Sequence, residues 1–193
     1  MDYNFKPGYQ YYKLYKPFGV LTQFSKDTEN QKCLKDIIQV SRDVYPVGRL
    51  DKDSEGLLIL SNDAGLTDWL LNPKNKRAKT YWAQVEGIIT DEAIERLAEG
   101  VRIRIKKKDF TVKAADISKL EEVHLPERIP PIRKRESIPT SWIELSISQG
   151  KNRQIRRMLA KLGFPVLRLA RYRIEDLTIE GMEAGELVPL VNL

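Results

Sequence analysis

The chain has 193 residues, 41% hydrophobic and 31% charged, which is typical of a folded globular protein and too apolar for a disordered one. Its longest apolar run, Leu57–Leu60, is too short to span a membrane, and the N-terminus lacks the apolar stretch of a signal peptide. Cys33 and His124 are the only residues of their types, so a zinc site of cysteines and histidines is excluded. These features predict a cytoplasmic protein with no membrane partner.

The first part of the chain contains both strand and helix patterns. Alternating apolar and polar residues predict a strand at Tyr12–Lys16, and helical spacing predicts a helix at Leu34–Gln39. Val44–Val47 is a short β-prone segment, and Leu57–Leu60 is continuously apolar, as expected of a strand buried on both faces. A second helix is predicted at Leu66–Leu71.

The middle of the chain is mostly β-like, with one helix and one long loop. Strands are predicted at Thr80–Glu86, Val101–Ile105, Phe110–Ile117 and Trp142–Ser148. A helix is predicted at Asp91–Glu99, ended by Gly100. Leu125–Thr140 holds four prolines and is expected to be a long basic loop able to contact phosphates. The pattern indicates the α+β class with a mainly antiparallel sheet.

The C-terminal part carries the most regular helix pattern and most of the positive charge. Ile155, Met158, Leu159 and Leu162 have helical spacing, with Asn152 as the expected N-cap. Residues 133–173 hold eleven Lys/Arg and only two acids. The whole chain has a net charge of +6, so the positive charge is concentrated in this segment. Such a basic block suits a polyanion such as RNA, but charge alone fits a solvated basic face equally well.

A charged loop between Val44–Val47 and Leu57–Leu60 has the sequence Gly48-Arg49-Leu50-Asp51-Lys52-Asp53-Ser54-Glu55-Gly56. Its acids match the opening of an EF-hand calcium loop, but Asn62 stands where that loop requires a bidentate glutamate. Calcium binding is therefore excluded. Composition alone leaves a charged turn without chemistry as the alternative to a functional loop.

The run 48–58 resembles the signature of the RsuA family of pseudouridine synthases, whose G-R-L-D run carries the catalytic aspartate. Three other segments match the family's motifs in the same order. They are Lys16-Pro17-Phe18-Gly19-Val20, Lys79-Thr80-Tyr81 with Val85-Glu86-Gly87, and Gly150-Lys151-Asn152-Arg153-Gln154-Ile155-Arg156-Arg157-Met158. Pro130-Pro131-Ile132-Arg133 and Ser137-Ile138-Pro139-Thr140-Ser141-Trp142 resemble the RluE branch, which lacks the S4 RNA-binding domain and modifies large-subunit ribosomal RNA.

The resemblance implies the pseudouridine synthase fold, a mainly antiparallel mixed sheet with flanking helices and a central RNA-binding cleft. It predicts a single catalytic domain over residues 12–193, which could comprise two subdomains. The leader of residues 1–11 is too short for an S4 domain. A monomer is expected.

The implied activity is that of an isomerase, which converts one uridine of 23S ribosomal RNA to pseudouridine. The bond from N1 to C1′ breaks and C5 takes the place of N1, so no atom is gained or lost and no metal or other cofactor is expected. Asp51 would act on a uridine flipped out of its stack. Three questions stay open: whether Asp51 attacks C1′ or takes a proton at C2′, which uridine is modified, and whether the substrate is naked RNA or an assembly intermediate.

The resemblance also assigns roles to Tyr81 and Arg156. Tyr81 would stack on the uracil and could accept its proton, although its face also carries Ala83 and Val85, as expected of a core tyrosine. Arg156, beside the apolar stripe of its helix, would pair with Asp51 and hold it ionised. The residues expected to contact RNA are Arg49, Arg133, Lys134, Arg135, Lys151, Arg153, Arg157 and Lys161. The alternative function is a non-catalytic basic protein of RNA binding or ribosome assembly, which would leave the Asp51 loop unexplained.

Overall fold

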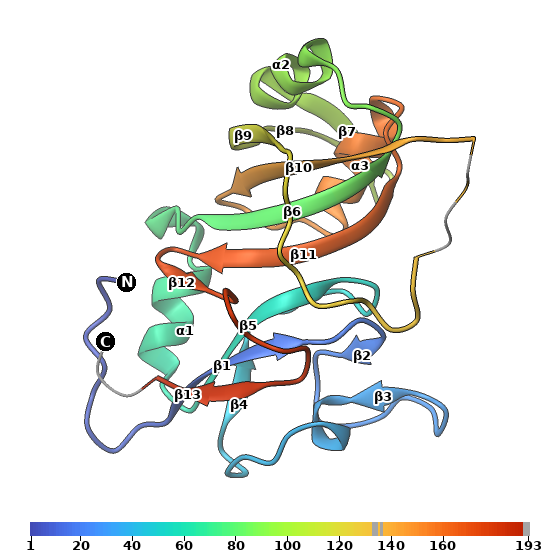
Figure 1. Ribbon diagram of the computed structural model, residues 1–193. Coiled ribbons are helices and arrows are strands. Elements are labelled where there is room, and N and C mark those ends of the chain that lie inside the picture. The colour runs from blue at the N-terminus through green and yellow to red at the C-terminus, as the bar shows by residue number, and fades with distance from the viewer. Residues whose placement is uncertain (133–134, 136, 191–193) are drawn as a thin grey trace. The chain divides into compact units, whose positions relative to one another are not determined.

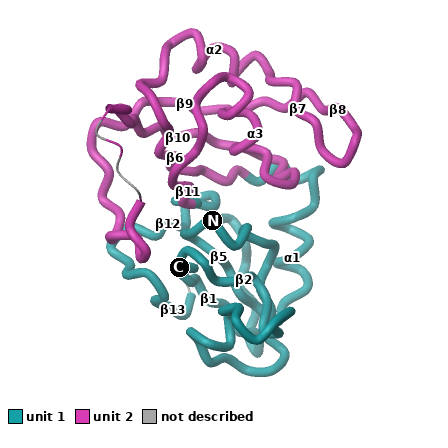
Figure 2. Tube along the Cα trace, turned by 90° about the vertical axis from the view of Figure 1, so that its right-hand side faces the viewer, with its two compact units in different colours: residues 1–77, 171–193 teal, residues 78–170 magenta. Residues whose placement is uncertain are grey.

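The computed structural model describes residues 1–132, 135 and 137–190 (Figure 1). The chain divides into two compact units, unit 1 with residues 1–77 and 171–193 and unit 2 with residues 78–170 (Figure 2). The predicted α+β class with a mainly antiparallel sheet is confirmed. No helix among the described residues is long and apolar enough to cross a membrane.

The main sheet of unit 1 is built around β5 (Glu55–Ser61), whose seven residues are all buried, as the continuous apolar run predicts, and β2 and β3 form a separate parallel pair. β1 and β4 both pair antiparallel with β5, β13 pairs with β1, and β11 also lies beside β5 (Figure 1). The other strands with residues in this unit are β1 (Tyr11–Lys16), β2 (Val20–Leu21), β3 (Lys32–Cys33), β4 (Tyr45–Val47), β11 (Val166–Ile174), β12 (Leu177–Thr178) and β13 (Leu187–Pro189).

Helix α1 (Ala64–Leu71) of unit 1 matches the predicted helix, but the prediction at Leu34–Gln39 is wrong. That segment forms only one 3-10 turn, η1 (Leu34–Asp36), because Ile37 leaves the helical region with φ −127°. The Asp36 carboxylate accepts the backbone N–H of Cys33 at 2.8 Å, which fixes the start of the turn. A second 3-10 turn, η2 (Pro73–Asn75), follows α1.

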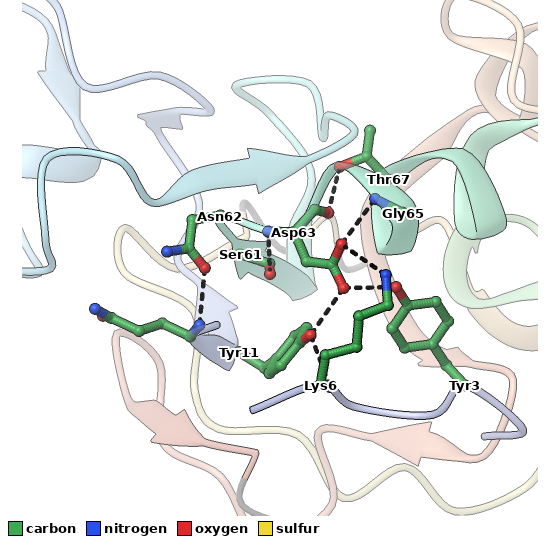
Figure 3. A network of polar contacts seen from close by, with 9 residues as sticks. Tyr3, Lys6, Tyr11, Ser61, Asn62, Asp63, Gly65 and Thr67 are labelled. Atoms are coloured by element: carbon green, nitrogen blue, oxygen red, sulfur yellow. Dashed lines mark hydrogen bonds and ion pairs between the residues drawn. The ribbon is translucent and has the colours of Figure 1, made fainter. Parts of the chain in front are cut away.

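Asp63, between β5 and α1, ties the N-terminal segment to unit 1 (Figure 3). One carboxylate oxygen accepts hydrogen bonds from the hydroxyls of Tyr3, at 2.6 Å, and Tyr11, at 2.8 Å. The other accepts the N–H of Gly65 at 2.8 Å, which caps α1, and lies 3.5 Å from the Lys6 ammonium. Burial raises the pKa of this carboxyl, but these hydrogen bonds and the ammonium outweigh burial and hold the pKa below its usual range.

In unit 2 the sheet order is β11, β6, β10, β9, and β7 and β8 form a separate antiparallel hairpin (Figure 1). β6 and β10 pair antiparallel over their full length, with Tyr81 opposite Leu145. The buried residues of the two strands include Ala83, Val85 and Ile143. The strands of unit 2 other than β11 are β6 (Lys79–Glu86), β7 (Val101–Ile105), β8 (Lys108–Val112), β9 (Ala115–Leu120) and β10 (Thr140–Ile147).

Helix α2 (Asp91–Glu99) has the predicted bounds and ends at Gly100. Helix α3 (Gln154–Lys161) packs against β7 and buries Ile155, Met158 and Leu159 of the predicted apolar stripe, whereas the fourth residue, Leu162, is the half-buried C-cap. The prediction of Asn152 as N-cap is wrong. Arg153 occupies that position in a left-handed conformation, with φ 52°, and no side chain caps the helix.

The single strand predicted at Phe110–Ile117 is two strands, β8 and β9. The chain breaks at Ala114, whose N–H bonds to the carbonyl of Leu97 in α2 at 3.0 Å rather than to a strand. Asp116 has φ 47°, outside the β region. A contact with α2 therefore overrides the continuous alternation of the sequence.

The nine-residue strand β11 was not predicted, and it changes the interpretation of the basic block. Arg168 and Arg171 of this strand are buried. Arg168 donates to the carbonyl of Pro126 at 2.8 Å, and Arg171 donates through Nε to the carbonyl of Leu57 at 2.7 Å. These two arginines belong to the interior of their units, so the charge count overestimated the basic surface available to RNA.

Candidate active site and RNA-contacting residues

Asp51 lies in unit 1, on the loop between β4 and β5, and is half-buried. Leu50, the residue before Asp51, is fixed by Thr22. The Thr22 hydroxyl donates to the carbonyl of Leu50 at 2.7 Å and accepts the Leu50 N–H at 3.2 Å. On the other side, the Asp51 carbonyl accepts the N–H of Ser54 at 3.0 Å and closes a turn. The backbone that carries the carboxylate is therefore held before and after it.

The segment Lys16–Val20 is fastened to the Asp51 loop. The N–H of Gly19 donates to the carbonyl of Lys52 at 2.8 Å, with Gly19 at φ 82°. The Lys16 ammonium, with no exposed surface, donates to the carbonyls of Pro17 and Val20, both at 2.8 Å. Burial lowers the pKa of Lys16 to about 7, against the opposing effect of the carboxylates of Glu55, Asp53 and Asp51.

A second buried cation, Arg171, lies beside the start of β5. Gly56 makes this packing possible: it has φ 103°, and a Cβ there would lie 2.4 Å from the carbonyl oxygen of Arg171. The adjacent Glu55 is 3% exposed and accepts a hydrogen bond from the Tyr15 hydroxyl at 3.2 Å. Buried side chains of both positive and negative charge, those of Lys16, Arg171 and Glu55, therefore lie beside the Asp51 loop.

Tyr81 lies in unit 2, on the face of β6 that also carries Ala83 and Val85, and is 8% exposed. No residue in the described part of the chain hydrogen-bonds to its hydroxyl. The flanking residues are fixed: Thr80 shares a hydroxyl–hydroxyl hydrogen bond of 2.9 Å with Ser146, and the Trp82 indole donates to Glu144 at 2.7 Å. The Tyr81 side chain therefore extends from a strand whose adjacent residues are fixed by hydrogen bonds to β10.

Arg156 also belongs to unit 2, on α3, and is half-buried. Its Nη1 donates to the backbone carbonyl of Val166 at 3.2 Å, which orients the guanidinium from one side. Of the three residues predicted to be catalytic, Asp51 therefore belongs to unit 1, and Tyr81 and Arg156 belong to unit 2.

The residues predicted to contact RNA have varied surroundings. Arg49, Arg153 and Lys161 are exposed. The Lys151 ammonium lies 4.4 Å from the centroid of the Phe110 ring. Arg135 forms an ion pair of 2.7 Å with Glu86, so part of its charge is already compensated. Arg157 donates to the carbonyl of Arg104 at 3.1 Å, and Arg133 and Lys134 lie outside the described residues.

Sequence reasoning left several supporting residues out of the candidate site. Lys16 stood in a matched motif without a role, although a lysine at the end of a predicted strand could have suggested a buried charge. Thr22 and Arg171 had no local signal, because their partners Leu50 and Leu57 are distant in sequence. Within residues 1–132, 135 and 137–190, no three His, Cys, Asp or Glu side chains are grouped as a metal site requires.

Comparison with known proteins identifies the family. Residues 10–161 match the family model described as RNA pseudouridylate synthase. This chain belongs to that family. A relative from Vibrio vulnificus, "Ribosomal large subunit pseudouridine synthase E", is 46% identical over 89% of this chain and 70% of its own length. A relative of the same name from Xanthomonas axonopodis pv. citri is 42% identical over 88% of this chain and 87% of its own.

The fold agrees with the family assignment. A solved structure titled "Crystal structure of pseudouridylate synthase" superimposes with a TM-score of 0.73 at 26% identity, over 95% of this chain and 70% of that one. The predicted pseudouridine synthase fold is thereby confirmed, and so is the predicted RsuA-type family with its relatives of the synthase E type. The matched region contains the Asp51 loop, Tyr81 and Arg156.

Proposed function

We propose that this protein isomerises one uridine of large-subunit (23S) ribosomal RNA to pseudouridine, with Asp51 as the catalytic carboxylate. The observation that carries the proposal is the Asp51 loop itself. This chain, a member of the family, holds the aspartate of its G-R-L-D run half-exposed. Thr22 fixes the loop that carries this aspartate, and the buried Lys16 lies beside that loop. The names of its relatives support ribosomal RNA of the large subunit as the substrate.

The chemistry requires an ionised oxygen beside the glycosidic bond. Asp51 would either attack C1′ or remove the proton at C2′ while the N1–C1′ bond breaks. The uracil then turns, and C5 bonds to C1′ as the Asp51–C1′ bond breaks or, on the second route, as the proton returns to C2′. The proton on C5 is then lost while N1 gains one. In this proposal Tyr81 stacks on the flipped base and can accept the late proton, and Arg156 keeps Asp51 ionised by a charge-assisted hydrogen bond.

Residues 12–193 would act as one catalytic domain, and the enzyme would work as a monomer in the compartment where ribosomes assemble, the cytoplasm. Unstacking the uridine costs a few kcal/mol, which contacts with the base and backbone must offset. Arg49, Arg153 and Lys161, exposed and basic, are suited to that backbone contact.

The test is to map pseudouridines in ribosomal RNA from cells that lack the protein. We expect one large-subunit site to lose its pseudouridine and to regain it with a plasmid encoding the wild type but not Asp51→Asn. Asp2→Asn, which changes an exposed carboxylate to an amide, is the matched control and should restore the site fully. An unchanged map would favour the non-catalytic RNA-binding function instead.

A further inference from the structure

The β7–β8 hairpin of unit 2 has a concentration of positive charge that the sequence analysis overlooked. Residues 101–113 contain six Lys/Arg and a single acid, Asp109. On β7, Val101, Ile103 and Ile105 are buried while Arg102 and Arg104 are exposed. The alternation of a strand thus sends the apolar side chains inward and the arginines outward.

The exposed arginines of β7 and the outer face of α3 line one groove. The groove has a volume of about 570 Å³. Its basic lining residues are Arg102 and Arg104 from β7 and Arg157 and Lys161 from α3. Asp109 is the one acid in its lining and forms an ion pair of 2.7 Å with Arg102. The lining therefore keeps an excess of three positive charges.

The remaining three cations of the groove have no carboxylate partner among the described residues. Arg157 is nevertheless oriented, because its Nη1 donates to the backbone carbonyl of Arg104 at 3.1 Å. A guanidinium that is already held in one orientation at the groove lining can bind a phosphate oxygen through its outer N–H groups with little further loss of side-chain freedom.

The turn of the hairpin adds two more cations in an unfavourable conformation. Ile105 pairs with Lys108, so Lys106 and Lys107 form a two-residue turn, with φ 45° and 67°. Positive φ at both central residues defines the type I′ turn, in which Asn-Gly is strongly preferred. Lysine at both positions is locally unfavourable, and such strain is often found where a segment has a function.

We propose that the groove between β7 and α3, together with the Lys106–Lys107 turn, binds backbone phosphates of the RNA. The inference rests on the proposed function and adds to it a second contact surface of the enzyme, built by Arg102, Arg104 and Lys106–Lys107 with Arg157 and Lys161. An acidic protein partner is disfavoured, because the lining offers no exposed aromatic or large apolar anchor of the kind found in the core of protein interfaces. Phosphates require only the cations.

The first experiment removes two charges of the groove. In Arg104→Gln/Lys161→Gln the backbone carbonyl that holds Arg157 is retained. Binding of a large-subunit ribosomal RNA transcript is measured at several salt concentrations. We expect roughly tenfold weaker binding at low salt, and a salt slope reduced by about 0.7 to 0.9 for each phosphate that the variant no longer binds.

The matched control is Arg42→Gln/Lys74→Gln, which removes the same charge from exposed positions of unit 1. It should leave the slope unchanged. An unchanged slope in the groove variant, or an equal fall in the control, overturns the proposal. Conversion of the transcript by the wild type is measured in parallel: no conversion counts against the proposed function, whereas conversion with an unchanged slope counts only against the groove.

The second experiment separates RNA binding from stability. Lys106→Asn/Lys107→Gly installs the preferred type I′ pair, so the Tm should rise by about 2 to 4 °C if the hairpin gains about 1 kcal/mol. RNA binding should nevertheless weaken, with a smaller salt slope. A variant that is more stable and binds RNA as tightly as the wild type would show that the turn contributes nothing to binding.

Discussion

An aspartate lies near each end of β5, and the two differ in burial and in how the chain holds them. Asp63, after the strand, is 2% exposed and accepts hydrogen bonds from two tyrosine hydroxyls and one backbone N–H (Figure 3). Asp51, before the strand, is half-buried on a loop whose backbone is held by Thr22 and by the turn to Ser54. One carboxylate is saturated by donors, whereas at the other the structure fixes the backbone and leaves the side chain partly open to solvent.

The difference fits a stabilising role for Asp63 at one end of the strand and the catalytic role proposed for Asp51 at the other. A carboxylate surrounded by donors is stabilised in a single arrangement, so a substrate atom cannot reach it without breaking several hydrogen bonds. A carboxylate on a clamped loop keeps its position without losing access. Substitutions at the two ends should therefore separate activity from stability.

The largest effect is expected for Asp51→Asn. Pseudouridine formation should fall by about 10³-fold or more, because the amide is neither a nucleophile nor a base, while the Tm should stay within about 2 °C of the wild type. The measurements are single-turnover conversion of ribosomal RNA and thermal unfolding.

Asp63→Asn is the matched partner of that variant and should show the reverse. It loses charge-assisted hydrogen bonds worth roughly 2 to 3 kcal/mol in total, so its Tm should fall by several degrees while its rate per folded molecule is retained. If Asp51→Asn unfolds as readily as Asp63→Asn, or if Asp51→Asn remains active, the assignment of activity to Asp51 and of stability to Asp63 is wrong.

After the loss of activity in Asp51→Asn, the largest loss of stability is expected for Gly56→Ala. A Cβ at position 56 would lie 2.4 Å from the carbonyl oxygen of Arg171, so backbone must move in addition to the strain of φ 103°. We expect a loss of about 3 kcal/mol or more, a fall in Tm of roughly 10 °C and reduced activity, since β5 begins beside the Asp51 loop.

Gly163→Ala separates the strain at Gly56 from the clash. Gly163 has a similarly positive φ of 92°, but nothing lies within 4 Å of its would-be Cβ. Its substitution should cost only about 1 kcal/mol. Equal losses for the two variants, measured by urea unfolding, would mean that close packing against Arg171 is unimportant.

Several features of this region were predictable from sequence. The buried β5 follows from a continuous apolar run, and the role expected of Asp51 follows from its motif and the motifs collinear with it. The two bonds between Thr22 and Leu50 were not predictable, because 28 residues separate the partners and a threonine carries no signal for a distant backbone. Arg171 was likewise counted as surface charge, since its carbonyl partner exists only in the folded chain.

The prediction errors in unit 2 also come from tertiary contacts. β11 carries three arginines without a strict period of two, which reads as a basic stretch, and only the fold shows that Arg168 and Arg171 are buried. The break between β8 and β9 depends on a bond from Ala114 to Leu97 in α2. The arginines of β7 were visible as a strand pattern, but their groove needs α3, which is about fifty residues later in the sequence.

Lys16→Met should change how stability depends on pH. Burial lowers the pKa of Lys16 from 10.5 to about 7, so above pH 7 the unfolded chain binds the proton more readily than the folded one. The wild type should therefore gain stability as the pH rises from 6 to 8.5, by about 2 kcal/mol, and the Met variant should lack this gain.

The control for Lys16→Met is Lys13→Met, because Lys13 is on the same strand but only half-buried. Urea unfolding at several pH values provides the free energies. If the wild type and Lys16→Met change in parallel with pH, the buried lysine does not titrate in this window. The cation beneath the Asp51 loop would then stay charged throughout.

The smallest effect is expected for Tyr3→Phe, which removes one donor from Asp63 and leaves Tyr11 and Gly65 in place (Figure 3). Burial, followed by the bond to Asp63, raises the pKa of the Tyr3 hydroxyl, so it remains a donor at neutral pH. The loss should be about 1 kcal/mol at pH 7, with no change in the rate of pseudouridine formation.

The pH dependence of that loss follows from the lowered pKa of Asp63. A carboxylate with a depressed pKa contributes stability above its ordinary pKa of 3.8 and loses it as the pH falls through the folded-state value. The difference between Tyr3→Phe and the wild type should therefore shrink in urea unfolding at about pH 3. Tyr45→Phe, at a position 62% exposed, should match the wild type at both pH values. A loss at pH 7 that persists unchanged in acid would mean that Tyr3 stabilises unit 1 by packing against Phe5 and Trp69 rather than through the carboxylate.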